Sequence, residues 1–371
     1  MRISPSMDRK WPVIGKQTPV AKGQPQNGAD KTPWHHLPDG RFRNPPGSPN
    51  RTAGLRDMLP FMERMFRHSF RDIEIPDHHV VPREQARGAL NKALAPGNAD
   101  RGVVTWLGHA SFLLRIGGKT ILTDPYLTTY AGPVGFGPRR YVPSGIAVRD
   151  LPPIDVLAIS HNHYDHLDET ALHRLPGKDT MTVVAPLGLG DFFRERGFRF
   201  VVDMDWYQSL TLNDLTIKAL PCIHWSRRSG LDTNRSLWAA FSFEGPQGRV
   251  FFGGDTAYGP VFEEIGTREG PFDLALIGIG AYEPRAIMKA SHANPEEAVQ
   301  IGIDIGARTL VGMHWGTVIL TEEPPFEPPE RFVAAGRERG FADDDIWIMR
   351  IGETRFLPSR RTDIDGHDGN D

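Results

Sequence analysis

The sequence predicts a mixed fold of the α+β or α/β class, in which two sheets are covered by helices. From Val103 onward, short apolar runs alternate with turn signals such as Gly117-Gly118, which is the pattern of successive strands. Stretches with helical periodicity fall between several of these runs. Two sheets with helices packed against them account for this mixture.

The predicted strands are short apolar runs with turn residues between them. They are Val103–Leu107, Ser111–Ile116, Lys119–Thr123, Asp155–Ile159, Met181–Ala185, Arg199–Val202, Leu215–Leu220, Leu237–Phe243, Arg249–Phe252, Asp273–Ile279 and Arg308–Met313. The predicted helices between them are Gly188–Arg196, Pro295–Ile305 and Pro329–Arg339. Asn294 can cap the second of these helices, because Pro295 suits its first position and acidic residues fill its first turn.

Residues 1–54 are rich in Pro, Gly and Asn, which predicts an irregular N-terminal extension, either wrapped on the body or disordered. One folded domain is expected over 55–358, with a helical lead-in over 55–100 and a polar tail over 359–371. The lead-in begins with apolar residues at three- and four-residue intervals, Leu55, Met58, Leu59, Met62, Met65 and Phe66. They predict an amphipathic helix over 55–70, interrupted by Pro60. Such a stripe is typical of core packing, and contact with lipid is the alternative.

The composition excludes several classes of protein. A net charge of −3 argues against a protein that coats nucleic acid, since that function needs an excess of Lys and Arg. The single cysteine, Cys222, excludes an intramolecular disulfide and a cysteine-based zinc cluster. No apolar run reaches the roughly 18 residues that a membrane span needs. The polar first residues contain no signal peptide. We therefore expect a cytoplasmic protein.

The most informative feature of the sequence is the run from Ser160 to Asp168, which has the spacing H-x-H-x-D-H. Its metal-capable side chains are His161, His163, Asp165 and His166. They directly follow the predicted strand Asp155–Ile159, where four buried polar groups would each need a partner. Two divalent metal ions would satisfy all four, because imidazole and carboxylate are usual zinc ligands. The alternative is a polar loop that is merely rich in histidine.

Further ligands are expected where other predicted strands end. His224, Asp255 and His314 each follow an apolar run, and open sheets usually place sites at the carboxyl ends of strands. The expected first ion is held by His161, His163 and His224. The expected second ion is held by Asp165, His166 and His314, and Asp255 bridges both. This set favours two zinc ions, although manganese or iron would accept the same ligands.

Several motifs together resemble one particular family. They are Thr105-Trp106-Leu107-Gly108-His109-Ala110-Ser111, Asp124-Pro125-Tyr126, Pro221-Cys222-Ile223-His224-Trp225-Ser226, Gly254-Asp255-Thr256, Pro295-Glu296-Glu297-Ala298 and Met313-His314-Trp315-Gly316. With Asn44-Pro45 and the metal motif, they cover residues 33–330 and resemble the N-acyl phosphatidylethanolamine-hydrolysing phospholipases D of the metallo-β-lactamase superfamily. The resemblance implies a four-layer αββα sandwich with an irregular N-terminal extension.

The resemblance also implies a reaction. A phosphodiesterase of this type hydrolyses N-acyl phosphatidylethanolamine, or a related phospholipid, to phosphatidic acid and N-acylethanolamine. A hydroxide held between the two ions would attack phosphorus. Asp255 would orient the nucleophile, Asp165 would act at the second ion, and His292 would lie near the substrate phosphate.

Residues around the ligands are assigned supporting roles. His109 and Asp124 are expected to be hydrogen-bond partners of the metal-bound histidines, which need such partners. The resemblance implies that the region of Met58, Met62 and Phe66 contacts acyl chains and the membrane surface, and that the protein is a homodimer. No nucleic-acid partner is expected.

Two other functions stay open at this stage. The same fold and ligands also serve metal-dependent lactonases, which share the Gly108-His109-Ala110-Ser111 motif, and hydrolases of soluble phosphodiesters. A catalytically silent binding scaffold is the third hypothesis, but it predicts that a ligand is missing, whereas all seven are present.

Overall fold

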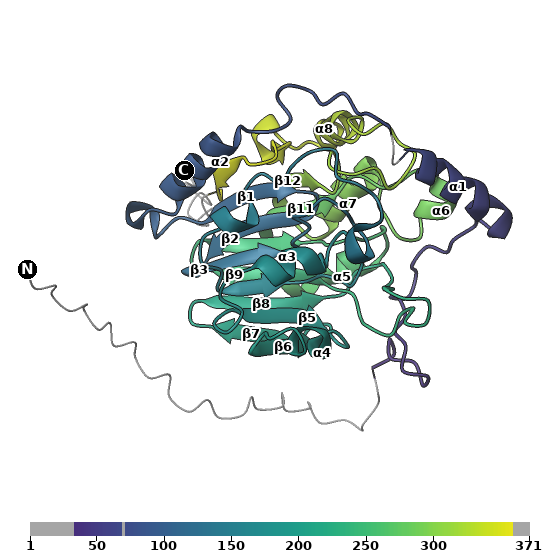
Figure 1. Cartoon of the computed structure of the whole chain (residues 1–371), viewed down its shortest axis with the longest axis horizontal. Helices are drawn as coiled ribbons and strands as arrows, with labels where there is room; N and C mark the ends of the chain where they lie inside the picture. Colours follow the sequence, from purple (N-terminus) through teal and green to yellow (C-terminus); the bar gives the residue numbers. More distant parts are fainter. Residues whose placement is uncertain (1–32, 69–70, 359–371) are drawn as a thin grey trace, which may run out of the picture. The chain divides into compact units, whose positions relative to one another are not determined.

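The computed structural model describes residues 33–68 and 71–358, and these residues form two facing mixed sheets covered by helices. The first sheet has the order β14-β1-β2-β3-β4-β5-β6, and the second has the order β13-β12-β11-β10-β9-β8-β7 (Figure 1). The first contains β1 (Val103–Gly108), β2 (Ser111–Ile116), β3 (Lys119–Thr123), β4 (Val156–Ala158), β5 (Thr182–Pro186), β6 (Phe200–Met204) and β14 (Thr354–Phe356). The second contains β7 (Ser209–Leu212), β8 (Leu215–Leu220), β9 (Ala240–Gly245), β10 (Gly248–Phe252), β11 (Phe272–Gly278), β12 (Ala307–Met313) and β13 (Ile346–Trp347).

Each sheet joins an antiparallel half to a parallel half. In the first, β1, β2 and β3 are antiparallel neighbours, and β3 to β6 run parallel. In the second, β7 to β10 are antiparallel and β10 to β13 are parallel. The predicted mixture of α+β and α/β features is therefore confirmed.

Alternation of apolar side chains places the strands between two buried layers. On β2, Phe112 and Leu114 belong to the core between the sheets, whereas Leu113 belongs to the outer core under the helices. β4 repeats the pattern, with Val156 and Ala158 facing inward and Leu157 facing outward. Both faces of the sheet are buried, which explains why these strands are apolar runs without strict alternation of apolar and polar residues.

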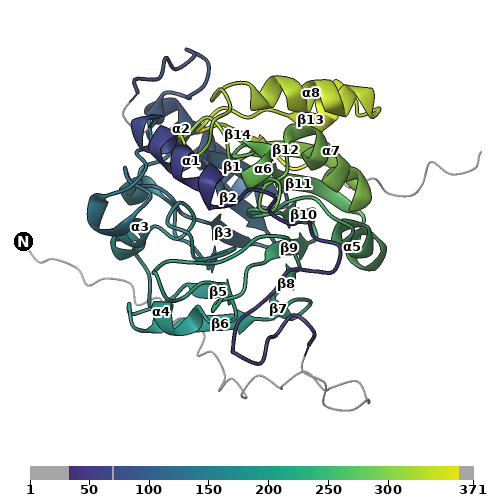
Figure 2. The same ribbon diagram turned by 90° about the vertical axis from the view of Figure 1, so that its right-hand side faces the viewer.

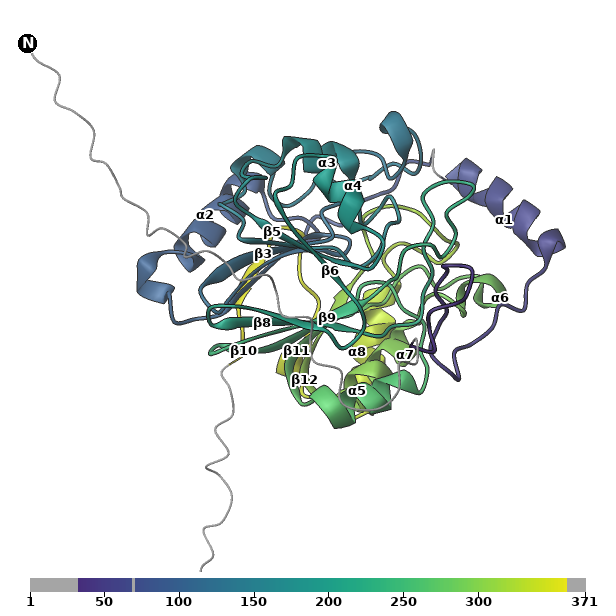
Figure 3. The ribbon, with the colours of Figure 1, turned by 90° about the horizontal axis from the view of Figure 1, so that it is seen from below.

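Helices cover the outer face of each sheet, which gives the predicted four-layer αββα arrangement (Figure 3). The helices over the first sheet are α2 (Arg83–Ala93), α3 (Glu169–Arg174) and α4 (Gly190–Arg194). Those over the second sheet are α5 (Val261–Glu269), α7 (Pro295–Asp304) and α8 (Pro328–Glu338). α7 begins with the predicted cap, because Asn294 and Glu297 form a capping box.

Two elements before the first sheet approach the ends of the strands. In the extension, Asn44 Oδ1 accepts hydrogen bonds from the backbone N–H of His224 and from Trp238 Nε1, both at 3.0 Å. α1 (Leu55–His68) continues through Pro60 and lies beside α6 (Arg285–Met288) (Figure 2). Residues 35–54 of the extension thus pack against the body, while residues 1–32 and the tail from 359 lie outside the described residues.

The structure corrects several predicted boundaries. β9 begins at Ala240 and not at Leu237, because the backbone N–H groups of Leu237 and Ala239 bond to Leu187 and Ser160, in loops that follow strands of the first sheet. The short strands β7, β13 and β14 and the helix α5 were not predicted. The core interpretation of the α1 stripe is wrong for Leu59 and Met62, whose exposed fractions are 70% and 61%.

Candidate metal centre

All seven predicted ligands lie at one edge of the two sheets, where strands end. The loop after β4 carries His161, His163, Asp165 and His166, and the segments after β8, β10 and β12 carry His224, Asp255 and His314. The register of β11 and β12 pairs Gly278 with Met313, so the ends of these parallel strands are level. Polar side chains released after level strands meet at the same edge, which explains their convergence.

The first group consists of three histidines whose ring nitrogens face one point. His163 Nδ1 lies 2.8 Å from His161 Nε2 and 3.2 Å from His224 Nε2. Burial, together with neighbouring histidines, lowers the pKa of His163 to about 3. Burial also lowers the pKa of His224 to about 4 and that of His161 well below its usual value. The three rings are therefore neutral at pH 7.

The hydrogen bonds made by Nδ1 of His161 and of His224 determine which nitrogen of each ring carries a lone pair. His224 Nδ1 donates to the carbonyl oxygen of Ser291 at 2.9 Å, so its Nε2 carries a lone pair. Ser160 Oγ donates to Asp124, so His161 Nδ1 must donate to Ser160 Oγ, at 2.9 Å. We infer from this network that His161 and His224 point lone pairs at the same place, as metal ligands must.

The second group contains one carboxylate and two histidines. Asp165 Oδ2 lies 3.5 Å from His166 Nε2 and 3.6 Å from His314 Nε2. In the described part of the chain, the Nε2 atoms of His166 and His314 are buried without a hydrogen-bond partner. Buried polar atoms without partners are rare, and a bound cation would satisfy these two.

Asp255 lies between the two groups. Its Oδ1 is 3.1 Å from His314 Nε2, and its Oδ2 is 3.2 Å from His166 Nε2 and 3.7 Å from His224 Nε2. It is thus a carboxylate within reach of both sets of ring nitrogens. His161, His163, His224 and Asp255 could hold one ion together, since their ligand atoms all lie within 4.8 Å of one another. The donor set fits two divalent ions with Asp255 shared between them.

When no cation is bound, protonated His166 and His314 compensate the negative charge of the two buried carboxylates, Asp165 and Asp255. Burial lowers the pKa of His314, but Asp255 and Asp165 outweigh it and raise this pKa to about 9. Burial lowers the pKa of His166 as well, but the same two carboxylates outweigh it and raise this pKa well above its usual value. The pKa of Asp255 is held well below its usual value by the neighbouring histidines, although burial raises it.

Metal binding at pH 7 is therefore expected to release protons. His166 and His314 must lose their protons before their Nε2 atoms can bind a cation, so loading both ions should release about two protons per chain. Since the folded-state pKa of His314 is raised to about 9, the apparent affinity for metal should rise with pH up to that value. Calorimetric titration with zinc in buffers of different ionisation enthalpy measures the release. An unchanged heat across buffers at pH 7 would contradict this protonation pattern.

Asp124 and His109, predicted as partners of the ligands, lie directly behind them. Asp124 is fully buried and accepts from His166 Nδ1 at 2.7 Å and from the backbone N–H of Ser160 at 2.7 Å. His109 Nε2 lies 2.9 Å from Asp165 Oδ2 and donates to it. The backbones of His109, Asp124 and His314 have positive φ values of 56°, 33° and 62°. Such strained residues cluster at functional sites, where the surrounding structure holds them.

A glycine allows the close approach of the two metal-bearing loops. At Gly254, φ is 55°, and a Cβ atom would lie 2.6 Å from Cβ of Ser160. A side chain at this position would therefore push Asp255 away from the loop after β4.

The sequence did not predict the roles of several residues that orient the ligands. Ser160 and the carbonyl oxygen of Ser291 fix two ring tautomers, and Trp225 packs edge-on against His163 with ring centroids 4.4 Å apart. Arg228 holds the metal loop, because its guanidinium lies 4.0 Å from the ring of Tyr164 and donates to the carbonyl oxygen of Asn162. Ser160 begins the metal motif and could have been identified from it, whereas a backbone carbonyl leaves no signal in a sequence.

A cavity of about 210 Å³ opens onto the ligands His163, Asp165 and Asp255. His292 lines it, with Nδ1 3.9 Å from Asp255 Oδ2. Burial lowers the pKa of His292 well below its usual value, so its neutral ring suits hydrogen bonding to a substrate. The rest of the lining is largely apolar and comes from α1, α6 and neighbouring loops: Met58, Phe61, Trp225, Ile287, Met288 and Leu320.

The three predicted substrate contacts on α1 are placed differently. Met58 lines the cavity, as expected of a substrate contact. Met62 does not line it and is exposed, because it lies on another side of α1, whereas the neighbouring Phe61 is buried and does line it. The side chain of Phe66 lies outside what the structure describes.

Comparison with known proteins identifies the family. The model of the β-lactamase superfamily domain matches residues 119–315, more than half of the chain, including all seven predicted ligands. The chain belongs to the metallo-β-lactamase superfamily. The fold predicted from the resemblance is therefore confirmed. Membership also supports the coarse assignment as a metal-dependent hydrolase.

Relatives extend this picture. An N-acyl-phosphatidylethanolamine-hydrolyzing phospholipase D of Caenorhabditis elegans is 39% identical over 240 residues, which are 61% of this chain and 67% of the relative. An uncharacterised protein of Mycobacterium tuberculosis is 42% identical over 245 residues, 64% of this chain, and the match spans only 65% of that protein's length. Igni18, a metallo hydrolase of Ignicoccus hospitalis, superposes with a TM-score of 0.52 at 20% identity and therefore shares the fold. That match covers 70% of this chain and 99% of Igni18.

Among the described residues, none of the helices has the length and apolar character needed to cross a membrane. The cytoplasmic location, the homodimer and the membrane contact stay predictions.

Proposed function

We propose that this chain is a two-zinc phosphodiesterase of the phospholipase D type. Its substrate would be N-acyl phosphatidylethanolamine or a related phospholipid, and its products phosphatidic acid and an N-acylethanolamine. The observation that carries the proposal is the convergence of seven ligand side chains beneath a cavity whose walls are largely apolar. The relative from Caenorhabditis elegans that bears this activity in its name supports the choice of substrate.

The residues around the cavity fit a substrate that is anionic at one end and apolar at the other. Two bound zinc ions would supply Lewis acidity and lower the pKa of a water between them. Arg51 and His292 line the cavity beside the ligands, where they can donate hydrogen bonds to phosphate oxygens. Met58, Phe61 and Ile287 present apolar surface to the rest of the substrate.

The orientation of the reacting group is set by the carboxylates. Asp255 reaches both ligand groups, and in this proposal it fixes the distance between the attacking water and the phosphorus atom. Asp165 Oδ2, the oxygen that faces His166 and His314, accepts a hydrogen bond from His109 Nε2, which restricts the rotation of the carboxylate. The largely apolar walls around the phosphate would strengthen these electrostatic interactions by limiting the access of water.

Interfacial presentation of the substrate is a further part of the proposal. Leu59 and Met62 project from the same helix that lines the cavity, with exposed fractions of 70% and 61%. Apolar side chains exposed beside a site are typical of contact with lipid or with another protein. A peripheral membrane contact through α1 would bring the cavity to its substrate.

Turnover in mixed micelles tests the proposed reaction. The zinc-loaded protein should release phosphatidic acid from N-acyl phosphatidylethanolamine. The double variant Leu59→Ser/Met62→Ser should turn over micellar lipid about tenfold more slowly, since two apolar contacts with the interface are lost. It should hydrolyse a soluble phosphodiester as the wild type does. Ile303→Ser, a matched change of a partly exposed apolar residue on α7, is the control.

Two results would contradict the lipid assignment. If the zinc-loaded protein cleaves a lactone or a soluble phosphodiester but releases no phosphatidic acid, the metal centre stands and the substrate is wrong. If it binds zinc but cleaves none of these compounds, the hypothesis of a silent scaffold replaces the enzyme.

A further inference from the structure

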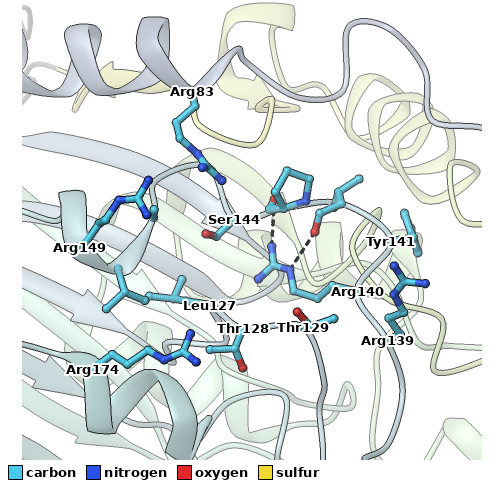
Figure 4. A pocket seen from close by; sticks show the side chains of 14 residues that line it. Arg83, Leu127, Thr128, Thr129, Arg139, Arg140, Tyr141, Ser144, Arg149 and Arg174 are labelled. Carbon is cyan, nitrogen blue, oxygen red and sulfur yellow. Dashed lines mark hydrogen bonds between the residues drawn. The ribbon is translucent and has the colours of Figure 1, made fainter. Parts of the chain in front are cut away.

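A second and larger cavity, of about 670 Å³, shares no lining residue with the cavity over the metal ligands. Its lining includes five arginines and contains no aspartate or glutamate. The arginines come from separate segments: Arg83 begins α2, Arg139 and Arg140 follow η2 (Pro133–Gly135), Arg149 lies in η3 (Val148–Asp150), and Arg174 ends α3. Figure 4 shows Arg83, Arg149 and Arg174 projecting toward one space from three sides.

Arg140 gives this cavity a fixed positive charge. It is 6% exposed, and its guanidinium donates to the carbonyl oxygens of Val142 at 3.1 Å and Leu107 at 3.4 Å, and to that of Tyr126. Figure 4 marks contacts of this kind around Arg140. Burial lowers its pKa, but only to about 10, so the group is charged at neutral pH. Within the described residues it has no carboxylate within 4.0 Å, and a buried charge without a counter-ion is costly.

The backbone around Arg140 makes room for it. At Gly108, φ is 103°, and a Cβ atom would lie 2.6 Å from Arg140 Nη2. Glycine is therefore required at the end of β1 if the guanidinium is to occupy this place. The same glycine directly precedes His109, which donates a hydrogen bond to Asp165. The glycine that makes room for Arg140 and the histidine that holds Asp165 therefore lie in one turn.

The other arginines remain available to a ligand. In the part of the chain that the structure describes, Arg83, Arg139 and Arg174 form no ion pair with a carboxylate, and all three are exposed. Among the residues that the structure describes, Arg149 pairs only with its neighbour Asp150, at 3.8 Å, and its side chain is 81% exposed. The nearby carboxylate of Asp168 is engaged by the backbone N–H groups of Thr128 and Ala171. The cavity thus has an excess of positive charge that the chain itself does not neutralise.

We propose that this cavity binds an anion that carries a phosphomonoester or diphosphate group. Guanidinium groups match phosphate oxygens with paired hydrogen bonds, and several of them around one space favour a multiply charged ligand over a carboxylate. The volume suits a ligand larger than phosphate alone. Leu127, Val142 and Val148 supply apolar surface for the uncharged part of such a ligand. The group can come from a soluble compound or from a lipid headgroup.

Two binding measurements on the zinc-loaded protein distinguish these sources. The first is calorimetric titration with pyrophosphate. The second is sedimentation with phosphatidylcholine vesicles, with and without phosphatidic acid. The test variant is Arg83→Gln/Arg174→Gln, because both side chains are exposed and neither supports the backbone. The control is Arg199→Gln, an exposed arginine that does not line the cavity. Any pyrophosphate or phosphatidic acid that binds at the metal centre does so in the wild type and in both variants. This contribution to the measured affinity therefore cancels in the comparison.

The double variant should bind at least one of the two ligands about tenfold or more weakly, since each lost charge-assisted hydrogen bond is worth roughly this factor or more. The control should bind as the wild type does, and zinc content and thermal unfolding should be unchanged in both variants. A loss for pyrophosphate identifies a soluble ligand, and a loss confined to phosphatidic acid vesicles identifies a headgroup. If the wild type binds neither ligand, or if the double variant binds both as tightly as the wild type, the proposal is wrong. Neither result bears on turnover at the metal centre.

Discussion

Asp255→Asn is expected to lower kcat by about 10³-fold or more, whichever ester proves to be the substrate. The change keeps the shape of the side chain but removes the negative charge that lies 3.1 Å from His314 Nε2 and 3.2 Å from His166 Nε2. An amide offers one weak oxygen donor in place of the two carboxylate oxygens that would bind the two proposed ions. The protein should therefore lose one of the proposed ions as well as its activity.

Steady-state kinetics and metal analysis after gel filtration measure both effects. Asp191→Asn is the matched control, since that carboxylate is 88% exposed on α4 and should tolerate the same change. Turnover within tenfold of the wild type, with two ions retained, would show that Asp255 does not bridge the ions.

The second large effect is expected at Asp124, which does not line the cavity over the ligands. Its Oδ2 accepts from His166 Nδ1 at 2.7 Å and from Ser160 Oγ at 2.5 Å. In Asp124→Asn, the new NH2 group must face either the backbone N–H of Ser160, which bonds to Oδ1, or the two donors at Oδ2, so in either orientation a buried donor loses its acceptor and the support of His166 is weakened. Zinc affinity should fall by about 10- to 100-fold, the usual cost of losing such a partner.

A competition titration against a chromophoric chelator measures this affinity. Asp203→Asn is the control, because it also removes a partly buried carboxylate that accepts a backbone N–H, that of Gly190, but far from the ligands in sequence. An affinity equal to that of the wild type would mean that Asp124 contributes to folding alone.

Much of the fold was predictable because its signals are local. β1, β2, β3, β8 and β12 are short apolar runs with turn residues on both sides, and burial on both faces makes such runs easy to read. The order of ligands along the chain could also be read, since each one follows a strand end. Asn294 and Glu297 predicted the start of α7, because the capping interactions between them lie within one helical turn.

What escaped prediction depends on contacts between distant segments. Asn44 was singled out only as part of the family resemblance, and no local pattern in the sequence predicts that it supports His224 across 180 positions. On α1, helical periodicity alone could not say which apolar residues are covered, and Phe61 rather than Leu59 is buried. The arginine-lined cavity combines residues from 83 to 174 with no common spacing, so only the folded chain brings them together.

Hydrogen bonding also distinguishes the candidate metal centre from a second cluster of histidines and a carboxylate. His35, His36 and Asp205 lie close enough to hold a cation. However, His35 Nε2 and His36 Nε2 already bond to opposite oxygens of Asp205, at 2.7 and 2.8 Å. The Asp205 carboxylate is satisfied by hydrogen bonds, whereas the Nε2 atoms of His166 and His314 lie close to Asp255 but make no hydrogen bond among the described residues. We therefore expect metal at the strand ends and not at this cluster.

The most direct test of the metal centre is a diffraction measurement on zinc-loaded crystals at wavelengths on both sides of the zinc absorption edge. The anomalous difference map should show two peaks per chain. One should lie among His161, His163 and His224, the other among Asp165, His166 and His314, and Asp255 should contact both. A single peak, or a peak at His35, His36 and Asp205 in place of these two, would contradict the two-metal centre and the mechanism built on it.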